Sequence, residues 1–477
     1  MTFDINQLAF YYPMLVLGAA GFIILAMGIM RLKSIIYATI SMAAFIIAFF
    51  LILMEWYNLL PYAVSQGMVF NGFGFYFAML FLVASGFVTY PALKNIAARS
   101  EIFYAMLLFV SVGMLIAAFS YNLIVLFISF EAVSIGTYII AGFHKTKRTL
   151  ESATKYFFTG TVATAFIIFG LSYFYLSTGT FSLLGSIAIS SKPDMLIALA
   201  FLIIGFGFKL AIFPMHQWAI DTYDGTENSV SSFLSTGSKL VAFVIMLKVF
   251  IAGFAGLDPY IYVFFAILAV ATMTYANIAA LSQNNLKRLL AYSSVAQAGY
   301  LILVFAVAGF APGSQATSYA IAAGMLYSLV YIFMKGGAFL TMNVIKKERP
   351  TMDDISGLAK KSPGVALAFS IILLSLAGIP LTGGFLAKFF LFLSLVQGGL
   401  WWLAVVAILN SAISVFYYFR VMMFMYWKQG SEDSSFDLSV SNKVPVYFSA
   451  AVVVVLFFIF GLFFTLLPFA AGVFGGI

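Results

Sequence analysis

Six ionisable side chains lie inside long apolar stretches of this sequence, where each of them is expected to be costly. They are Glu131, Lys155, Lys209, Lys239, Lys335 and Lys388. At the centre of a lipid-facing helix such a group costs roughly 2.5 to 3.5 kcal/mol, so six would cost about 15 to 20 kcal/mol. This sum rivals the ~5 to 15 kcal/mol net stability of a typical protein. We therefore expect the six groups to face one another or internal water, as groups on a pathway for ions or protons do.

The composition indicates a polytopic, all-α membrane protein. Of 477 residues, 64% are hydrophobic and 8% are charged, whereas charged residues make up about 25% of a soluble domain. A helix needs ~20 apolar residues to cross a bilayer, and the long apolar runs argue against the short alternating segments of a β-barrel. We expect about fourteen spans: 8–30, 34–57, 69–92, 101–120, 122–142, 155–177, 195–219, 231–255, 259–281, 286–308, 318–345, 364–396, 400–427 and 445–470.

The remaining segments leave little room for other chemistry in this chain. The longest polar connections, 178–194, 346–363 and 428–444, are too short to bury a core, so redox catalysis is expected on another chain. The absence of cysteine excludes thiolate-held iron-sulfur clusters and disulfides, and two histidines argue against haem or metal ligation. Met1 to Phe10 contain no basic residue, so no cleavable signal peptide is expected.

The net charge of +8 is informative through its placement. In a soluble chain it would suggest nucleic acid as a partner, but here the basic loop residues follow odd-numbered predicted helices, with Lys192 as the exception. The positive-inside rule then places these loops in the cytoplasm and both termini outside. The residues are Arg31, Lys33, Lys94, Arg99, Lys145, Lys147, Arg148, Lys287, Arg288, Lys346, Lys347, Arg349, Lys360, Lys361, Lys428 and Lys443.

The charges also repeat along the chain. Lys155 pairs with Lys335, Lys209 with Lys388 and Lys239 with Arg420, at separations of 180, 179 and 181 residues. Glu131 and Gln297 form a looser fourth pair. Because the shift equals five helices, the second copy would be inverted, which is a common transporter plan. We expect four segments: 1–100 with helices 1–3, 101–257 with the first repeat, 258–428 with the second, and 429–477 with helix 14.

Both copies contain a helix that glycine and proline should break near mid-membrane. In the first copy, Gly205 and Gly207 precede Lys209 and Pro214 follows it; in the second, Gly378, Pro380, Gly383 and Gly384 precede Lys388. Unwound backbone at that depth must be covered by protein or water. The seventh and twelfth helices are therefore predicted to be broken, each with a lysine beside the break.

Each singled-out residue also has a structural interpretation. Glu131 is expected to pair with Lys209, although a protonated acid satisfied by nearby hydroxyls is the alternative. Burial disfavours the charged form of an amine, which lets a lysine exchange protons, but a fixed ion pair would serve structure alone. For Lys155, Lys335 and Lys248, the alternative to a buried functional position is a side chain that snorkels to the membrane interface. His216 either relays protons or caps the break. Asp221, Asp224 and Glu227 are most simply a solvated acidic loop, and the alternatives are a funnel for cations or a docking site for a partner.

Six segments closely resemble the antiporter-like membrane subunits of respiratory complex I, and subunit N in particular. They are FISFEAVSIGTYIIAGF (127–143), ATKYFFTG (153–160), GFGFKLAIFPMHQWAIDTYDG (205–225), NLKRLLAYSSVAQAGY (285–300), GIPLTGGFLAKFFLF (378–392) and NSAISVFYYFRV (410–421). The resemblance implies a membrane-arm subunit that translocates protons. It also implies a Glu131–Lys209 pair modulated by Lys155, with Lys239 and Lys388 continuing a hydrated axis.

Two departures from that family pattern affect the predicted pathway. Gln297 stands where the wider family often has histidine, so a titrating relay on the tenth helix is in doubt, and Lys335 is an additional charge that can replace it. Lys248 and His216 complete the candidate relays. The sequence ends soon after the fourteenth predicted helix, so the long lateral helix of the largest family member is not expected here.

The resemblance implies a subunit of a translocating oxidoreductase that itself carries no cofactor. Flavin, iron-sulfur clusters and quinone or phenazine are expected in partner subunits, and the partners are other membrane-arm subunits and the lipid bilayer, in a prokaryotic cell membrane. The main alternative is a subunit of a multi-subunit sodium/proton antiporter, which the same fold and lysines would serve. A passive scaffold is a third alternative, against which the six costly groups argue.

Overall fold

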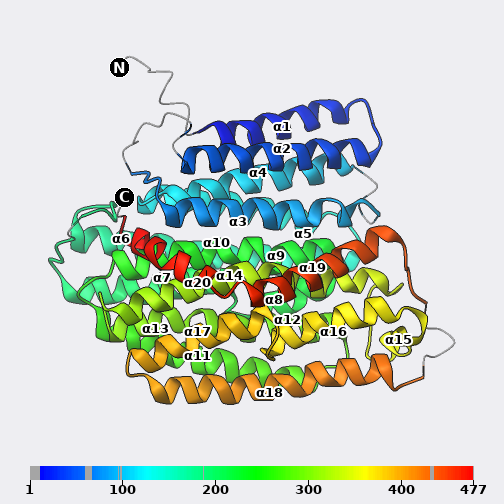
Figure 1. Cartoon of the computed structure of the whole chain (residues 1–477). Coiled ribbons are helices and arrows are strands. Elements are labelled where there is room, and N and C mark those ends of the chain that lie inside the picture. Colours follow the sequence, from blue (N-terminus) through cyan, green and yellow to red (C-terminus); the bar gives the residue numbers. More distant parts are fainter. Residues whose placement is uncertain are drawn as a thin grey trace. The chain divides into compact units, whose positions relative to one another are not determined.

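The computed structural model describes residues 11–57, 59, 67–94, 96, 99–185, 187–429 and 435–475, and nearly all of this part of the chain is helical (Figure 1). The helices form two compact units. Unit 1 contains residues 1–209, 237–256 and 468–477, and unit 2 contains residues 210–236 and 257–467. The units change near residue 257, where the second repeat is predicted to begin, whereas residues 210–236 pack with unit 2. The repeat boundaries and their inversion stay predictions.

Unit 1 is built around α4, which packs against α1, α2, α3, α5 and α10. Gly113 allows α4 and α5 to approach closely, since a Cβ there would lie 3.1 Å from Val133. The helices of unit 1 are α1 (Tyr12–Gly28), α2 (Ser34–Trp56), α3 (Gly72–Thr89), η2 (Pro91–Lys94), α4 (Ser100–Phe119), α5 (Leu123–Ala141), α6 (Lys147–Thr178), α7 (Lys192–Leu210), α10 (Gly237–Met246), the π-helical η3 (Leu247–Ala252) and η6 (Ala471–Phe474).

Unit 2 is built around α14, which packs against α9, α13, α16, α17 and α19. Its helices are α8 (Gln217–Gly225), α9 (Asn228–Ser235), α11 (Asp258–Leu281), α12 (Leu286–Leu301), α13 (Leu303–Phe310), α14 (Gln315–Thr341), η4 (Met342–Val344), η5 (Asp353–Ile355), α15 (Leu358–Lys361), α16 (Pro363–Ala377), α17 (Gly383–Gln397), α18 (Trp401–Tyr426), α19 (Val440–Phe458) and most of α20 (Leu462–Ala470).

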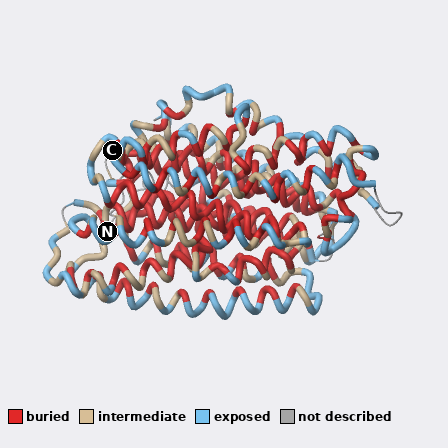
Figure 2. The backbone as a smooth tube through the Cα atoms, turned by 90° about the horizontal axis from the view of Figure 1, so that it is seen from below, coloured by how far each residue is buried: buried red, intermediate tan, exposed pale blue. Residues whose placement is uncertain are grey.

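The expected membrane architecture is confirmed. Twelve helical segments of the described chain are long and apolar enough to cross a bilayer. Shorter apolar helices account for the rest of the predicted spans: α1 matches the first, and α16 with α17 matches 364–396. Figure 2 shows helices that are buried along their length beside helices that alternate between buried and exposed residues. The exposed residues on the outer helices include Phe22, Phe158 and Phe416, as expected for surfaces that face lipid or neighbouring chains.

Both predicted helix breaks are present. Helix α7 ends at Leu210, and α8 begins only at Gln217. The chain turns at Ala211, whose φ is +58°. The second break lies between α16 and α17, where Gly378 and Leu381 have φ values of +83° and +70°. Gly378 adopts this left-handed conformation without steric cost, and it ends α16 at mid-span.

A third interruption lies inside the predicted 231–255 span. Helix α9 ends at Ser235, and Thr236 has a φ of −111° and a ψ of −88°. The hydroxyls of Ser235 and Thr236 both hydrogen-bond back to the Ser232 carbonyl, at 3.1 and 2.7 Å. Hydroxyls bonded to carbonyls one turn back perturb a helix, and Gly237 follows at once. The serine-rich run SVSSFLSTGSK therefore interrupts the span immediately before Lys239.

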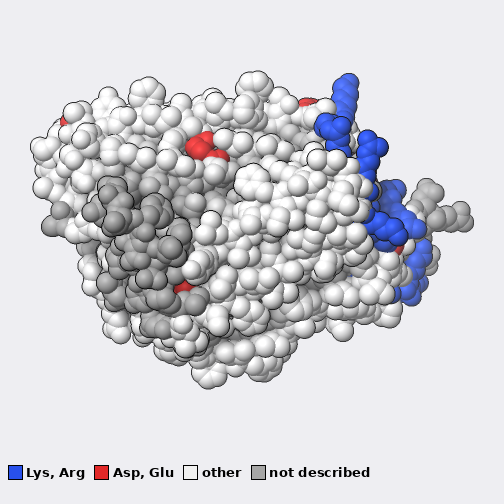
Figure 3. Space-filling model, turned by 90° about the horizontal axis from the view of Figure 1, so that it is seen from above, with Lys and Arg blue, Asp and Glu red and all other residues white. Residues whose placement is uncertain are grey.

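Five basic residues of unit 1 lie in alternate connections, after α1, α3 and α5. These are Arg31, Lys33, Lys94, Arg99 and Lys145. On the face drawn in Figure 3, the visible lysine and arginine side chains gather at one end and most of the remaining surface carries no charge. The cytoplasmic placement of these loops stays a prediction from the positive-inside rule.

Candidate functional site

Glu131 lies on α5 and is bound by a hydroxyl of α6. The Thr164 hydroxyl donates to Glu131 Oε1 over 2.8 Å. Within the described residues Glu131 and Lys209 form no ion pair at 4.0 Å or less. The expected direct pair is thus absent from this structure, and the carboxyl is satisfied by a neutral donor instead. The charges of Glu131 and Lys209 still interact through space.

Lys209 is the centre of a polar cluster in unit 1. Its side chain is 1% exposed, and its ammonium donates to the Thr137 hydroxyl over 3.0 Å and to the Tyr156 hydroxyl. The Lys209 nitrogen also lies 4.9 and 5.5 Å from the ring centres of Tyr156 and Tyr138. Electron-rich ring faces stabilise a cation in this position. The predicted burial of Lys209 beside the first break is confirmed, with hydroxyls and rings as its direct neighbours.

The Tyr156 hydroxyl links Lys209 to the start of α10. It hydrogen-bonds to the Thr137 hydroxyl over 3.1 Å, and Ser238 lies within its hydrogen-bonding reach. Lys239 follows Ser238 in sequence and is 1% exposed. The hydroxyls of Thr137 and Tyr156 therefore hold the Lys209 ammonium, and neither residue was among the predicted site residues.

Lys155 is placed differently from the other lysines. Helix α6 begins at Lys147, eight residues before the predicted span, so Lys155 belongs to its third turn. Its side chain is 49% exposed and forms an ion pair of 2.9 Å with Glu151, one turn earlier on the same helix. The expectation that Lys155 faces the interior of the chain is therefore wrong. The positions of Lys155 and Glu151 are those of an exposed i,i+4 pair.

Lys248 is fully buried in the π-helical segment η3. Its ammonium donates to three backbone carbonyls at the end of α4: Ala117 at 3.0 Å, Ala118 at 2.5 Å and Ser120 at 3.0 Å. Its nitrogen also lies 4.3 Å from the centre of the Tyr121 ring. The last carbonyls of a helix lack intrahelical partners and carry partial negative charge. Lys248 thus caps α4 from within the chain, and the snorkelling alternative is wrong.

In unit 2, Lys335 is buried on α14 and donates across to α12. Its ammonium contacts the Ser293 hydroxyl at 2.6 Å and the Leu290 carbonyl at 3.1 Å. The residue is 0% exposed. The snorkelling alternative for Lys335 is therefore excluded as well, and the side chain lies in the polar interior of unit 2.

Lys388 lies at the second helix break, as predicted. It is 3% exposed and donates to the carbonyls of Leu376 and Ala377 at 3.0 and 3.1 Å, and to the Ser411 hydroxyl at 3.0 Å. The two carbonyls end α16, so the break presents its free acceptors to the ammonium. A pocket of about 500 Å³ lies between α16, α17 and α18, and Lys388 is one of its lining residues.

Gln297 shares one of those acceptors with Lys388. Its side-chain amide donates to the Leu376 carbonyl over 3.0 Å, and its amide oxygen accepts from the Tyr327 hydroxyl. An amide neither gains nor loses a proton near neutral pH, so Gln297 holds the carbonyl that Lys388 also uses. An uncharged Gln297 can therefore help to hold the end of α16 beside Lys388, where the wider family often has histidine.

His216 follows the first break and is 2% exposed. Its ring stacks on Phe213, with ring centres 5.7 Å apart, and meets Tyr275 edge-on at 4.8 Å. The Gln217 amide lies 3.4 Å from its Nε2. Aromatic packing thus fixes the ring at the break, and both the relay and the capping hypotheses remain open.

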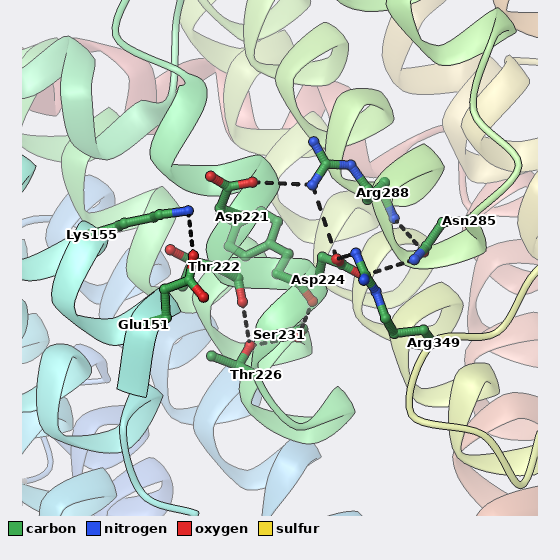
Figure 4. A network of polar contacts seen from close by, with 11 residues as sticks. Glu151, Lys155, Asp221, Thr222, Asp224, Thr226, Ser231, Asn285, Arg288 and Arg349 are labelled. Carbon is green, nitrogen blue, oxygen red and sulfur yellow. Dashed lines mark hydrogen bonds and ion pairs between the residues drawn. The ribbon is translucent and has the colours of Figure 1, made fainter. Parts of the chain in front are cut away.

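Asp221 and Asp224 lie on α8 in a network of ion pairs (Figure 4), and the solvated interpretation is wrong for Asp224, which is buried. Asp224 is 5% exposed and accepts from Arg349 at 2.7 Å and from the Asn285 amide at 3.0 Å. Asp221 accepts from Arg288 at 3.1 Å, whereas Glu227 caps the N-terminus of α9 by accepting from the backbone amides of Ser229 and Val230. The arginines arrive from α12 and from the connection after α14, which the linear sequence does not reveal.

The described residues contain no group of three or more His, Asp or Glu side chains that could hold a metal ion. Around Lys209, Lys335 and Lys388 the hydrogen-bond partners include hydroxyls and backbone carbonyls, and Glu131 is a carboxyl whose charge interacts with that of Lys209. Such an arrangement can accept, hold and pass protons, because amines titrate and hydroxyls both donate and accept.

Comparison with known proteins agrees with this geometry. Residues 120–414 match the family model described as NADH:quinone oxidoreductase/Mrp antiporter, TM. The chain is 39% identical to F(420)H(2) dehydrogenase subunit N of Methanosarcina mazei over 450 residues, which cover 88% of this chain and 90% of the relative. The chain belongs to this family, as a relative of subunit N. NADH-quinone oxidoreductase subunit N of Trichlorobacter lovleyi is 37% identical over 81% of both chains.

Solved structures show the same fold. A chain of respiratory complex I from Thermus thermophilus with bound aureothin has a TM-score of 0.82 and 28% identity, over 96% of this chain and 98% of that chain. A chain of the Mrp complex from Dietzia sp. DQ12-45-1b has a TM-score of 0.83 at 18% identity, over 98% and 97%. The second likeness shows the fold alone.

Proposed function

We propose that this chain is a proton-translocating membrane-arm subunit of a complex I type pump, in which electron transfer to a quinone-like acceptor drives proton transfer across the membrane. Its partners are the other membrane-arm subunits. Flavin, iron-sulfur clusters and the quinone or phenazine site belong to partner chains. The observation that carries this proposal is the burial of four amines, those of Lys209, Lys239, Lys335 and Lys388, in a relative of subunit N.

In unit 1, Glu131 and Lys209 form the part that responds to charge. A proton that arrives at Glu131 removes a negative charge near Lys209 and favours release of the Lys209 proton. Tyr156 and Ser238 then lead toward Lys239. Lys155, with its partner Glu151, modulates this cluster from the exposed side of α6, and His216, Lys248 and Gln297 take supporting positions. In unit 2, Lys335 and Lys388 continue the transfer.

The test is Lys209→Ala in the complete assembled complex, reconstituted in liposomes. The electron donor is NADH or reduced F420, whichever the complex oxidises, and a water-soluble quinone analogue is the acceptor. We expect proton uptake per electron to fall, because the titrating amine is gone. Lys360→Ala removes the same charge from an exposed position of the short helix α15 and should leave pumping unchanged. Normal pumping by an assembled Lys209→Ala complex would refute the proposal.

A second function is kept because the matched family includes Mrp antiporters. In that case the chain would exchange sodium for protons without electron transfer. Purification separates the two functions: flavin- and iron-sulfur-containing partners identify the redox pump, whereas membrane subunits alone identify the antiporter. Both curated relatives described above are dehydrogenase or oxidoreductase subunits, which favours the first function.

A further inference from the structure

A chain of buried hydroxyls leads away from Lys335 in unit 2. The Lys335 ammonium donates to the Ser293 hydroxyl over 2.6 Å, and the Ser293 hydroxyl is hydrogen-bonded to the Tyr418 hydroxyl. Ser293 and Tyr418 are both 0% exposed. The three residues come from α14, α12 and α18, so three helices converge on one continuous line of exchangeable protons.

The line of hydroxyls ends before the second helix break. Gln297 lies one helical turn after Ser293 on α12. Gln297 donates to the Leu376 carbonyl, which also accepts from Lys388 at 3.0 Å. The Gln297 amide neither gains nor loses a proton near neutral pH, so it does not extend the line of hydroxyls from Ser293 and Tyr418 to Lys388.

We propose that Ser293 and Tyr418 relay protons between Lys335 and water on the Lys388 side, a role that rests on the proposed function above. In one transfer, an N–H bond of the Lys335 ammonium breaks and a new O–H bond forms at Ser293. Ser293 passes its original proton to the Tyr418 oxygen, and Tyr418 passes its own proton to a water molecule. The amine loses one proton, the water gains one, and both hydroxyls end uncharged. Rotation of the two hydroxyls resets the line.

The same region provides a matched control. Ser294 follows Ser293 on α12, and its hydroxyl is hydrogen-bonded to the Tyr331 hydroxyl at 2.8 Å. Tyr331 is as deeply buried as Tyr418. However, this pair does not include Ser293, the hydroxyl to which Lys335 donates. Tyr331→Phe thus removes a buried tyrosine hydroxyl bonded to serine, while the proposed relay stays intact.

The experiment compares Tyr418→Phe, Tyr331→Phe, Lys335→Met and the double variant Lys335→Met/Tyr418→Phe in the complete complex. Phenylalanine keeps the ring that packs 4.4 Å from Tyr417 and removes the hydroxyl alone. Proton pumping, donor oxidation and thermal inactivation are measured for each variant. Positioned proton-transfer groups typically contribute about 10²- to 10⁴-fold to a rate, so we expect Tyr418→Phe to lower the pumping rate at least tenfold, with inactivation unchanged. Tyr331→Phe should pump normally.

Two further results distinguish a relay from a structural role. If Lys335 and Tyr418 act on one line, the double variant should pump as fast as the more impaired of the two single variants. The effects of residues that act on one pathway are not additive. Additive losses, or equal losses from Tyr331→Phe, would overturn the relay. If Lys335→Met impairs pumping and Tyr418→Phe does not, the relay is wrong and the proposed function stands. If Lys209→Ala and Lys335→Met both pump normally, the proposed function itself fails.

Discussion

Replacing Lys248 by methionine should destabilise the protein, because the ammonium caps three carbonyls of α4. Ala117, Ala118 and Ser120 are each 0% exposed, so methionine would leave their acceptors without the hydrogen bonds that Lys248 supplies. Each unsatisfied buried group costs about 1 to 3 kcal/mol. Removing a buried charge returns part of this cost, since an ion out of water carries a penalty of several kcal/mol.

Three carbonyls at the middle of that range cost about 6 kcal/mol, and a returned charge penalty of roughly 3 kcal/mol leaves a net destabilisation of about 3 kcal/mol. This corresponds to roughly a hundredfold shift between folded and unfolded populations. In the assay, the solubilised complex is heated, and the fraction that remains intact is measured by size-exclusion chromatography. Lys248→Met should lose integrity at a lower temperature than wild type. Lys33→Met, which removes an exposed lysine of the same unit, should not.

Pumping by the surviving complexes provides the refutation. If Lys248→Met is as heat-resistant as wild type and yet fails to pump, Lys248 carries protons and does not cap α4. If it is heat-sensitive but pumps normally at low temperature, the capping role holds. The two outcomes separate the structural function of this lysine from the relay function suggested by its place in an apolar span.

Two more predictions address the surroundings of Lys209 and a polar loop. A Cβ on Gly160 would lie 1.9 Å from the Tyr138 hydroxyl oxygen. Gly160→Ala should therefore displace the Tyr138 ring that lies near Lys209 and lower the pumping rate by about tenfold or more. Gly18→Ala is the control, because a Cβ at Gly18 meets nothing within 4 Å, and it should leave pumping unchanged. Burial alone would raise the pKa of Asp354, but hydrogen bonds from Lys347 and Thr351 lower it below its usual value. That carboxylate therefore stabilises the fold above its unfolded pKa of about 3.9, and the contribution is lost as pH falls through the lowered folded pKa. Asp354→Asn should cost about 1 kcal/mol at pH 7 and lose less thermal stability than wild type between pH 5 and pH 3; equal losses would contradict this reasoning.

The sequence predicted the membrane architecture and the two helix breaks because these depend on local composition. Apolar runs of sufficient length must span the bilayer, and Gly378 or Pro214 disturb a helix wherever they stand. Burial of Lys209 and Lys388 followed from the cost of exposing them to lipid. Lys155 was misplaced because α6 starts at Lys147, and the polar first turns contain residues that form helices well. A hydropathy window cannot separate those turns from the span.

The hydroxyl partners were not predictable in the same way. The chain contains 26 tyrosines, and nothing local distinguishes Tyr156 or Tyr418 from a tyrosine that merely packs. Their roles come from residues far away in sequence: Tyr156 meets Lys209, and Tyr418 meets Ser293. The same holds for Asp224, whose arginine partner lies 125 residues further along the chain. Pairings of this kind depend on helix packing, which a single sequence does not specify.

The type of acceptor around each lysine separates proton carriers from fixed cations. A neutral amine has two N–H groups and a lone pair, so it needs at least one neighbour that can donate. Lys209 has two hydroxyl partners, Lys388 has Ser411 and Lys335 has Ser293, and each hydroxyl can rotate and donate once the proton has left. Lys248 donates to three carbonyls, which only accept, so deprotonation would turn its lone pair toward a carbonyl oxygen. All four lysines are buried, but a hydroxyl partner supports proton transfer at Lys209, Lys335 and Lys388, whereas carbonyl partners alone oppose it at Lys248.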